Sequence, residues 1–143
     1  MHCRITPTRL GAALLTLTLT LVACGGGEST TPATPFCAAI GEVAARMEPN
    51  SGSMTPQAVE ARFDEVVTLL DEAEQTAPSV ITDDVATYAA AIDDYATALA
   101  AVGFDLDALF STPQGAQLAE DTSHALTPDV INHMTGPCGI TLR

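Results

Sequence analysis

The sequence predicts an all-α domain, built as an up-down four-helix bundle with both termini at the same end and one disulfide as a clip. Three observations lead to this prediction. Apolar residues recur at helical spacing along two long segments, Thr-Pro dipeptides recur at the expected helix starts, and Cys37 and Cys138 flank the helical part. No segment offers a convincing β-strand.

The first predicted helix covers residues 35–47 and begins at Thr34-Pro35. Threonine is a favoured N-cap, and proline at the next position lacks only a donor that a helix start would leave unpaired. Apolar side chains then share one face of the segment. They are Phe36, Ile40, Val43 and Met47.

Two long helices are predicted next, over residues 56–76 and 79–102, with a tight reversal at Pro78-Ser79 between them. Their apolar positions alternate in steps of four and three, which is typical of a buried helical seam. The positions are Val59, Phe63, Val66, Leu70, Ala73 and Ala77 in the first, and Ile81, Val85, Tyr88, Ile92, Tyr95, Leu99 and Val102 in the second. Gly103 is expected to end the second helix in a left-handed conformation.

A C-terminal helical region is predicted over residues 113–134, with a break at Thr127-Pro128. Before it, residues 104–110 are expected to form a short helical turn or a packed loop over one end of the bundle. Because the helix count is even, both ends of the domain, residues 35–143, should arrive together. This topology places Cys37 beside Cys138.

The segment before this domain is typical of a signal peptide. An apolar run over residues 10–23 follows two arginines and falls short of the ~20 residues that a membrane-spanning helix needs. It ends in Leu-Val-Ala-Cys at 21–24, which resembles the lipobox of bacterial lipoproteins. The resemblance implies cleavage between Ala23 and Cys24 and a diacylglyceryl group on Cys24. An ordinary secretory signal, with Cys24 unmodified, is the alternative.

The predicted domains are therefore a lipoprotein signal peptide over 1–23, a flexible tether over 24–34, and the bundle. Two acyl chains give stable membrane affinity without a transmembrane helix. The protein is thus expected on the extracytoplasmic face of the cell membrane. The Gly, Ser, Thr and Pro composition of the tether, GGGESTTPAT after the cysteine, is typical of a linker; whether its hydroxyls carry O-glycans stays open.

Only two of the four cysteines are expected to be available for a disulfide. Cys3 leaves with the signal and Cys24 takes the lipid, so Cys37 and Cys138 remain in a compartment where disulfides persist. We expect them to form a disulfide. Metal ligation is the rival interpretation, although neither cysteine has a Cys or His at close spacing.

The charged residues of the sequence argue against two classes of binding partner. All 18 acidic residues follow Cys24, and the mature part has three arginines and no lysine, giving a formal charge of −15. Nucleic acids and anionic lipid surfaces require clustered basic residues, so neither is expected to bind. The charge is expected mainly to keep the protein soluble, with cation binding or docking to a basic partner as the alternatives.

Candidate catalytic groups are few. His124 and His133, with Asp121 and Asp129 nearby, would form a metal site only if the break at Pro128 brought them together. A second candidate is the pair Asp83 and Asp94. These return to nearly the same helix face but stand ~16 Å apart, too far for a glycosidase pair. Solvent-facing histidines and a solvated acidic stripe are the expected outcomes, with no enzyme activity, metal or cofactor.

The mature chain also resembles a loose group of small actinobacterial lipoproteins. The shared features are the lipobox, a Thr/Pro/Gly tether, Phe36-Cys37 entering the first helix, acidic Ala-rich helices and Cys138-Gly139. The resemblance implies location and fold but no activity. We predict a non-enzymatic envelope protein that acts through protein contacts, with a carrier for a small apolar ligand as the alternative. The turn at Ala77-Pro78 and the segment running into the helix at 56–76 are expected to point away from the membrane and to meet a partner.

Overall fold

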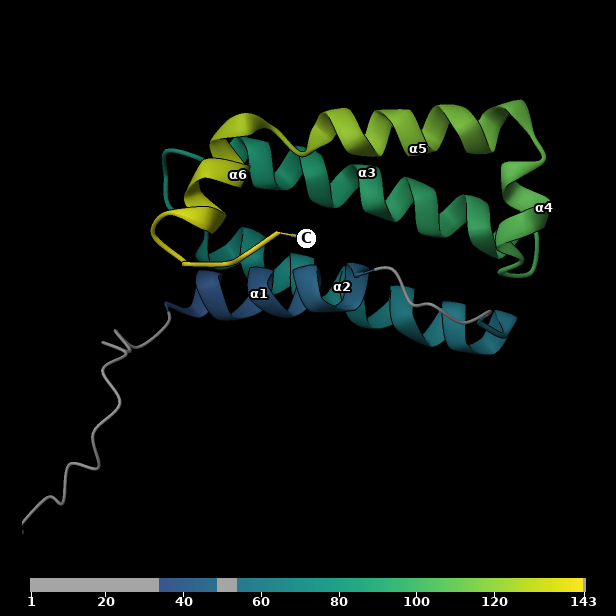
Figure 1. Ribbon diagram of the computed structural model, residues 1–143, viewed down its shortest axis with the longest axis horizontal. Coiled ribbons are helices and arrows are strands. Elements are labelled where there is room, and N and C mark those ends of the chain that lie inside the picture. The colour runs from purple at the N-terminus through teal and green to yellow at the C-terminus, as the bar shows by residue number, and fades with distance from the viewer. Residues whose placement is uncertain (1–33, 49–53, 143) are drawn as a thin grey trace, which may run out of the picture.

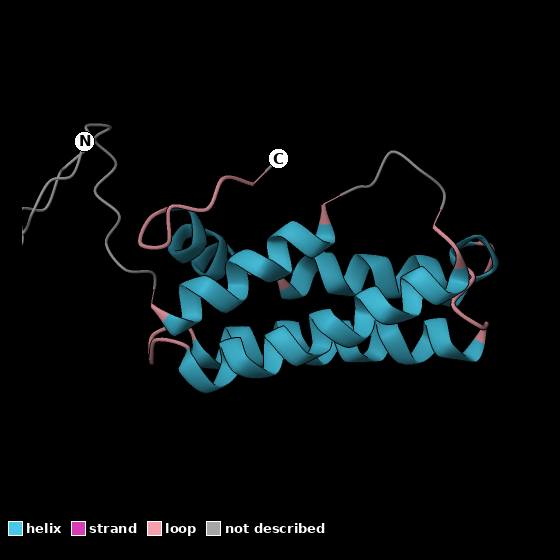
Figure 2. Ribbon diagram, turned by 90° about the horizontal axis from the view of Figure 1, so that it is seen from below, coloured by secondary structure: helices cyan, strands magenta, loops and turns pink. Residues whose placement is uncertain are grey.

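Six α-helices account for most of the chain that the computed structural model describes, residues 34–48 and 54–142 (Figure 1). They are α1 (Pro35–Met47), α2 (Pro56–Thr76), α3 (Thr82–Ala101), α4 (Leu106–Phe110), α5 (Pro113–Ala125) and α6 (Pro128–Thr135). These described residues contain no strand (Figure 2). The all-α prediction is confirmed.

The four Thr-Pro dipeptides start α1, α2, α5 and α6, as predicted. In each helix the threonine hydroxyl accepts a hydrogen bond from the backbone N–H three residues later, which would otherwise be unpaired. The donors are Cys37 (3.2 Å), Ala58 (3.3 Å), Gly115 (3.0 Å) and Val130 (3.4 Å). The predicted break at Thr127-Pro128 therefore separates α5 from α6.

α3 begins three residues later than predicted. A turn follows Pro78, closed by the Ile81 N–H donating to the Pro78 carbonyl at 2.9 Å, and Ile81 gives the helix no side-chain cap. At the other end Gly103 has a φ of 66°, and the N–H of Phe104 donates to the Leu99 carbonyl at 2.8 Å. Gly103 thus ends the helix as expected.

The segment 104–110 contains the short helix α4, which packs closely on α5. Gly115 makes this contact feasible, because a Cβ at that position would lie 2.2 Å from the Leu109 carbonyl oxygen. The lack of a side chain at Gly115 lets the two backbones approach. α4 is held in this way over one end of α3 and α5 (Figure 1).

The predicted seams form the core. α1 packs on α2, α2 on α3, and α3 on α5, while α6 lies against α1 and α3. The described residues bury no charged side chain. The largest fully buried side chains are Phe36, Ile40, Val59, Val66, Leu70, Val85, Ile92, Leu99 and Val130. Burying apolar side chains of this size stabilises a fold by about 1.5–3 kcal/mol each, before the conformational entropy that opposes folding.

On one side, the helices of the described residues do not cover the array completely. α1 has 13 residues against 21 in α2, and α1 and α5 do not share an extensive contact in the part of the chain described. α6 and the chain after it lie between them near the start of α1 (Figures 1 and 2). The helices therefore leave an opening beside α1, α6 and the C-terminal segment.

Candidate functional site

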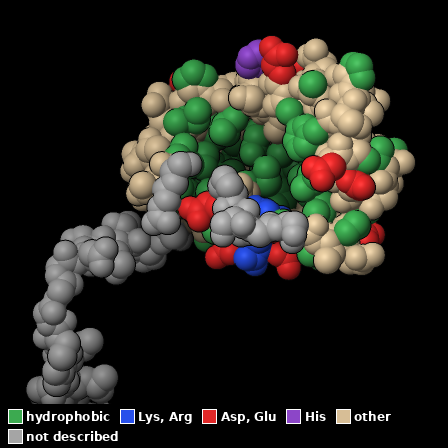
Figure 3. Space-filling model, turned by 45° about the vertical axis from the view of Figure 1, so that its right-hand side comes forward, with side chains coloured by type: hydrophobic (Ala, Val, Ile, Leu, Met, Phe, Trp, Pro, Cys, Tyr) green, Lys and Arg blue, Asp and Glu red, His purple; other side chains and the backbone are tan. Residues whose placement is uncertain are grey.

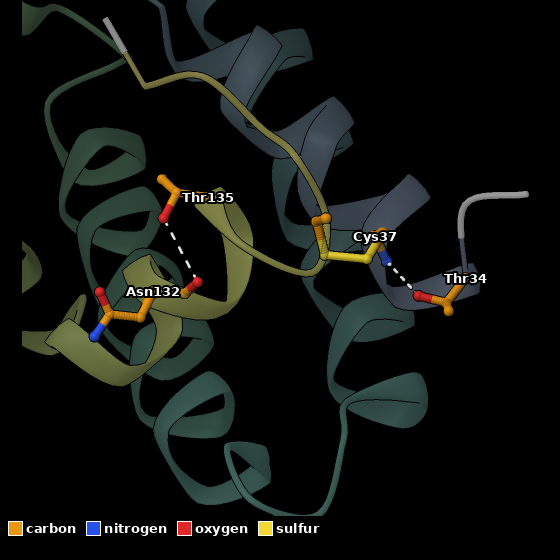
Figure 4. Close-up of a disulfide and its surroundings, with 5 residues drawn as sticks. Thr34, Cys37, Asn132 and Thr135 are labelled. Atoms are coloured by element: carbon orange, nitrogen blue, oxygen red, sulfur yellow. Dashed lines mark hydrogen bonds between the residues drawn. A yellow bond between two sulfur atoms is a disulfide. The ribbon is translucent and has the colours of Figure 1, made fainter. Parts of the chain in front are cut away.

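The Cys37–Cys138 disulfide forms as predicted. It joins the first turn of α1 to the segment after α6, and its two cysteines are 101 positions apart in sequence with their Cα atoms 5.2 Å apart (Figure 4). The cap on Thr34 fixes the Cys37 backbone from one side. The covalent link holds the two ends of the described domain together.

Backbone hydrogen bonds at the end of α6 position Cys138. Its N–H donates to the His133 carbonyl at 3.1 Å, and the Ile140 N–H donates to the Met134 carbonyl at 2.9 Å. Gly139, between them, has a φ of 64°, which favours glycine. The chain is thereby turned so that Ile140 packs against the core beside α1.

Ala23 and Cys24, the predicted cleavage and lipidation residues, lie outside the described residues. The predicted signal peptide and the predicted tether also lie outside the described residues, except for Thr34. Those assignments stay predictions. None of the described helices is long and apolar enough to cross a membrane.

The two histidines have different surroundings. His124 is exposed near the end of α5, whereas the His133 ring is half-buried and meets the Phe36 ring edge-on, with centroids 5.6 Å apart. The solvent-facing prediction therefore holds for His124 and is wrong for His133. His133 packs on α1 because α6 folds back over it.

The acidic residues of α3 are arranged as a solvated stripe. Asp83 and Asp94 are both exposed, as expected. Across residues 34–48 and 54–142, no group of three His, Cys, Asp or Glu side chains could hold a metal ion. Among the described residues, His124, His133, Asp83 and Asp94 therefore do not come together as a metal site.

A cavity of about 170 Å³ lies at the opening beside α1, and we call it the α1–α6 slot. Residues from α1, α3, the α5–α6 junction, α6 and the C-terminal segment line it, and most are apolar. The lining consists of Ile40, Val43, Ala44, Met47, Glu48, Tyr88, Leu126, Met134, Thr141 and Leu142. On the face shown in Figure 3, hydrophobic side chains line a hollow with acidic groups beside it.

Tyr88 is the unusual residue of the slot. Only 7% of its surface is exposed, and its hydroxyl has no hydrogen-bond partner among the described residues. Solvent nevertheless reaches the hydroxyl oxygen, because the described part of the chain contains no completely enclosed side-chain N or O atom that lacks a hydrogen-bond partner. Burial raises the pKa of Tyr88, so the hydroxyl keeps its proton at neutral pH.

Aromatic side chains gather at the opposite end of the molecule from the disulfide. The Phe63 and Tyr95 rings stack with centroids 5.6 Å apart, and the Phe110 ring lies 6.4 Å from that of Tyr95. Phe110 is 52% exposed. We call these three residues the far-end aromatic cluster.

The predicted partner surface at Ala77-Pro78 is misplaced. The α2–α3 turn lies at the same end as the start of α1 and the disulfide (Figure 1). Two antiparallel helices return the chain to the end from which it started, so the second turn cannot point away from the tether. The start of α2 does lie at the far end, as expected, together with α4 (Figure 1).

Comparison with known proteins adds no relative: the chain matches no protein-family model, no curated protein and no solved structure. The resemblance to small actinobacterial lipoproteins therefore stays a prediction. The slot and the far-end aromatic cluster are the sites that the geometry offers. Sequence periodicity placed Tyr88, Phe63 and Tyr95 in the buried seams without distinguishing them from ordinary core residues.

Proposed function

We propose that this protein is anchored on the extracytoplasmic face of the cell membrane through a diacylglyceryl group on Cys24, and that its domain binds another envelope protein without catalysing a reaction. The Cys37–Cys138 disulfide is the observation that carries the proposal. Such bonds persist in oxidising compartments outside the cytoplasm. The lipobox at 21–24 adds the means of attachment.

The proposed topology is an up-down four-helix bundle of α1, α2, α3 and α5. The tether then joins the domain at the disulfide end, and its 11 residues span at most about 40 Å. α2 adds roughly 30 Å along its axis. The far-end aromatic cluster is accordingly the part of the domain that reaches furthest from the bilayer.

The proposed partner presents an apolar side chain surrounded by lysine or arginine. Phe110 offers an exposed ring backed by a packed aromatic pair, which suits it to anchor an interface. Asp105, the N-cap of α4, and Asp107, in its first turn, are both exposed. Arg46 binds Glu65 at 2.6 Å and Arg62 donates to the Glu48 carbonyl at 2.7 Å, so both are engaged within the domain. A basic partner complements the remaining negative charge.

Photo-crosslinking in intact cells tests the partner. A photoreactive phenylalanine analogue at position 110 should give one discrete crosslinked product, because the ring is exposed at the proposed interface. The same analogue at Glu120, exposed on α5, is the matched control and should not give that product. No crosslink from position 110, or an identical product from position 120, would contradict the proposal. Mass spectrometry of the product identifies the partner.

A second candidate function is favoured by the slot. Its apolar lining and its volume of about 170 Å³ suit a carrier for a small apolar ligand. Pockets for drug-sized ligands usually measure about 300–1,000 Å³. This candidate is therefore restricted to a small molecule.

A further inference from the structure

We infer that the α1–α6 slot binds a small, uncharged molecule with an apolar body and one hydrogen-bonding group, and that the Tyr88 hydroxyl recognises that group. The inference rests on the carrier function proposed second and specifies its ligand. It does not depend on the lipid at Cys24. Three properties of the slot lead to it.

The first property is size. A cavity of about 150 Å³ is large enough to hold benzene, and the slot, which opens to solvent, has a volume of about 170 Å³. It therefore accommodates one ring with a small substituent, or a short branched chain. Ile40, Val43 and Met134, all at most 4% exposed, give this body an apolar surface.

The second property is the unpaired hydroxyl. A hydroxyl that no protein group pairs is paired by water, or by a ligand group that replaces the water. Tyr88 is 93% buried, lines the slot, and bonds to none of the described residues. The described residues leave no completely enclosed side-chain N or O atom unpaired, so water reaches the Tyr88 hydroxyl, and a ligand in the slot would take the place of that water. The protonated hydroxyl can donate to an oxygen of that molecule and also accept from it.

The third property is charge. Glu48 lies at the slot, and the described lining includes no Lys or Arg. An anionic ligand such as a fatty acid would be repelled by the strongly acidic protein as a whole. An alcohol, phenol or carbonyl compound avoids that repulsion. The ligand is accordingly uncharged.

Methionine-methyl NMR on the intact purified protein tests the inference with two probes of similar size, toluene and benzyl alcohol. Met47 and Met134 line the slot, whereas Met54 does not. Both probes should shift the Met47 and Met134 signals and leave that of Met54 in place. Benzyl alcohol should bind about 3- to 10-fold more tightly than toluene in the wild-type protein, the factor expected for one net hydrogen bond.

Tyr88→Phe removes the hydroxyl and keeps the ring. It should abolish the preference for benzyl alcohol and leave toluene binding unchanged. Tyr95→Phe is the matched control, because Tyr95 is likewise buried on α3 but lies outside the slot. It should alter neither affinity.

The outcomes separate the ligand class from the carrier function. If both probes bind equally in the wild-type protein, the role of Tyr88 is refuted and the slot remains a site for apolar molecules. If neither probe shifts Met47 and Met134, the carrier function fails as well, and water alone pairs with the hydroxyl. Equal weakening of both probes by Tyr88→Phe would also overturn the inference, because it would indicate a packing defect. Anchoring through Cys24 is unaffected by each result.

Discussion

Replacing both Cys37 and Cys138 with serine is expected to lower the free energy of unfolding by about 2–5 kcal/mol. The disulfide links residues 101 positions apart, so its loss frees nearly the whole domain in the unfolded state. Loop-closure entropy alone gives about 4.7 kcal/mol for a loop of this size. Urea unfolding followed by circular dichroism measures the change. The double substitution avoids leaving a single reactive thiol.

Reduction of the wild-type protein is the control for this prediction. Dithiothreitol should lower the stability of the wild type to that of the Cys37→Ser/Cys138→Ser variant and leave the variant unchanged. The C-terminal wall of the α1–α6 slot should loosen at the same time, since Cys138 anchors the segment that includes Thr141 and Leu142. Equal stability with and without the disulfide would contradict its role as a clip.

Replacing Cys24 with alanine is expected to move the protein from the membrane fraction to the soluble extracytoplasmic or culture fraction. The thiol would be the only attachment point for the diacylglyceryl group, and two acyl chains supply the membrane affinity. Cell fractionation followed by immunoblotting measures the distribution. The effect should be close to complete.

Cys3→Ala is the matched control for anchoring, because Cys3 lies within the predicted signal peptide. This variant should remain in the membrane fraction like the wild type. Retention of the Cys24→Ala variant would refute the lipid anchor and leave an ordinary secretory signal as the better interpretation. Both variants should still form the Cys37–Cys138 disulfide.

The sequence was informative wherever a local rule decides the structure. Thr-Pro capping depends on two neighbouring residues, and the four starts it predicted are present. The spacing of Val59, Phe63, Val66 and Leu70 correctly identified a buried face. The start of α3 was missed because the turn after Pro78 occupies residues that periodicity alone assigns to the helix.

The candidate sites were less predictable, because they depend on which helices cover one another. A helical seam shows that Tyr88 faces inward but not that the space beside it lacks a full-length neighbour. The opening arises from the shortness of α1 and the path of the chain after α6. Likewise, Phe63, Tyr95 and Phe110 come from three helices and meet only in the folded domain.

The mass of the intact protein, extracted from membranes without reductant, tests the anchored, disulfide-clipped domain most directly. The account predicts a chain that begins at Cys24, carries the added mass of a diacylglyceryl group, and gains two hydrogens only after reduction. The last change reports the Cys37–Cys138 bond. An unmodified Cys24, or a chain cut at another position, would contradict the anchor. Two free thiols before reduction would contradict the clip.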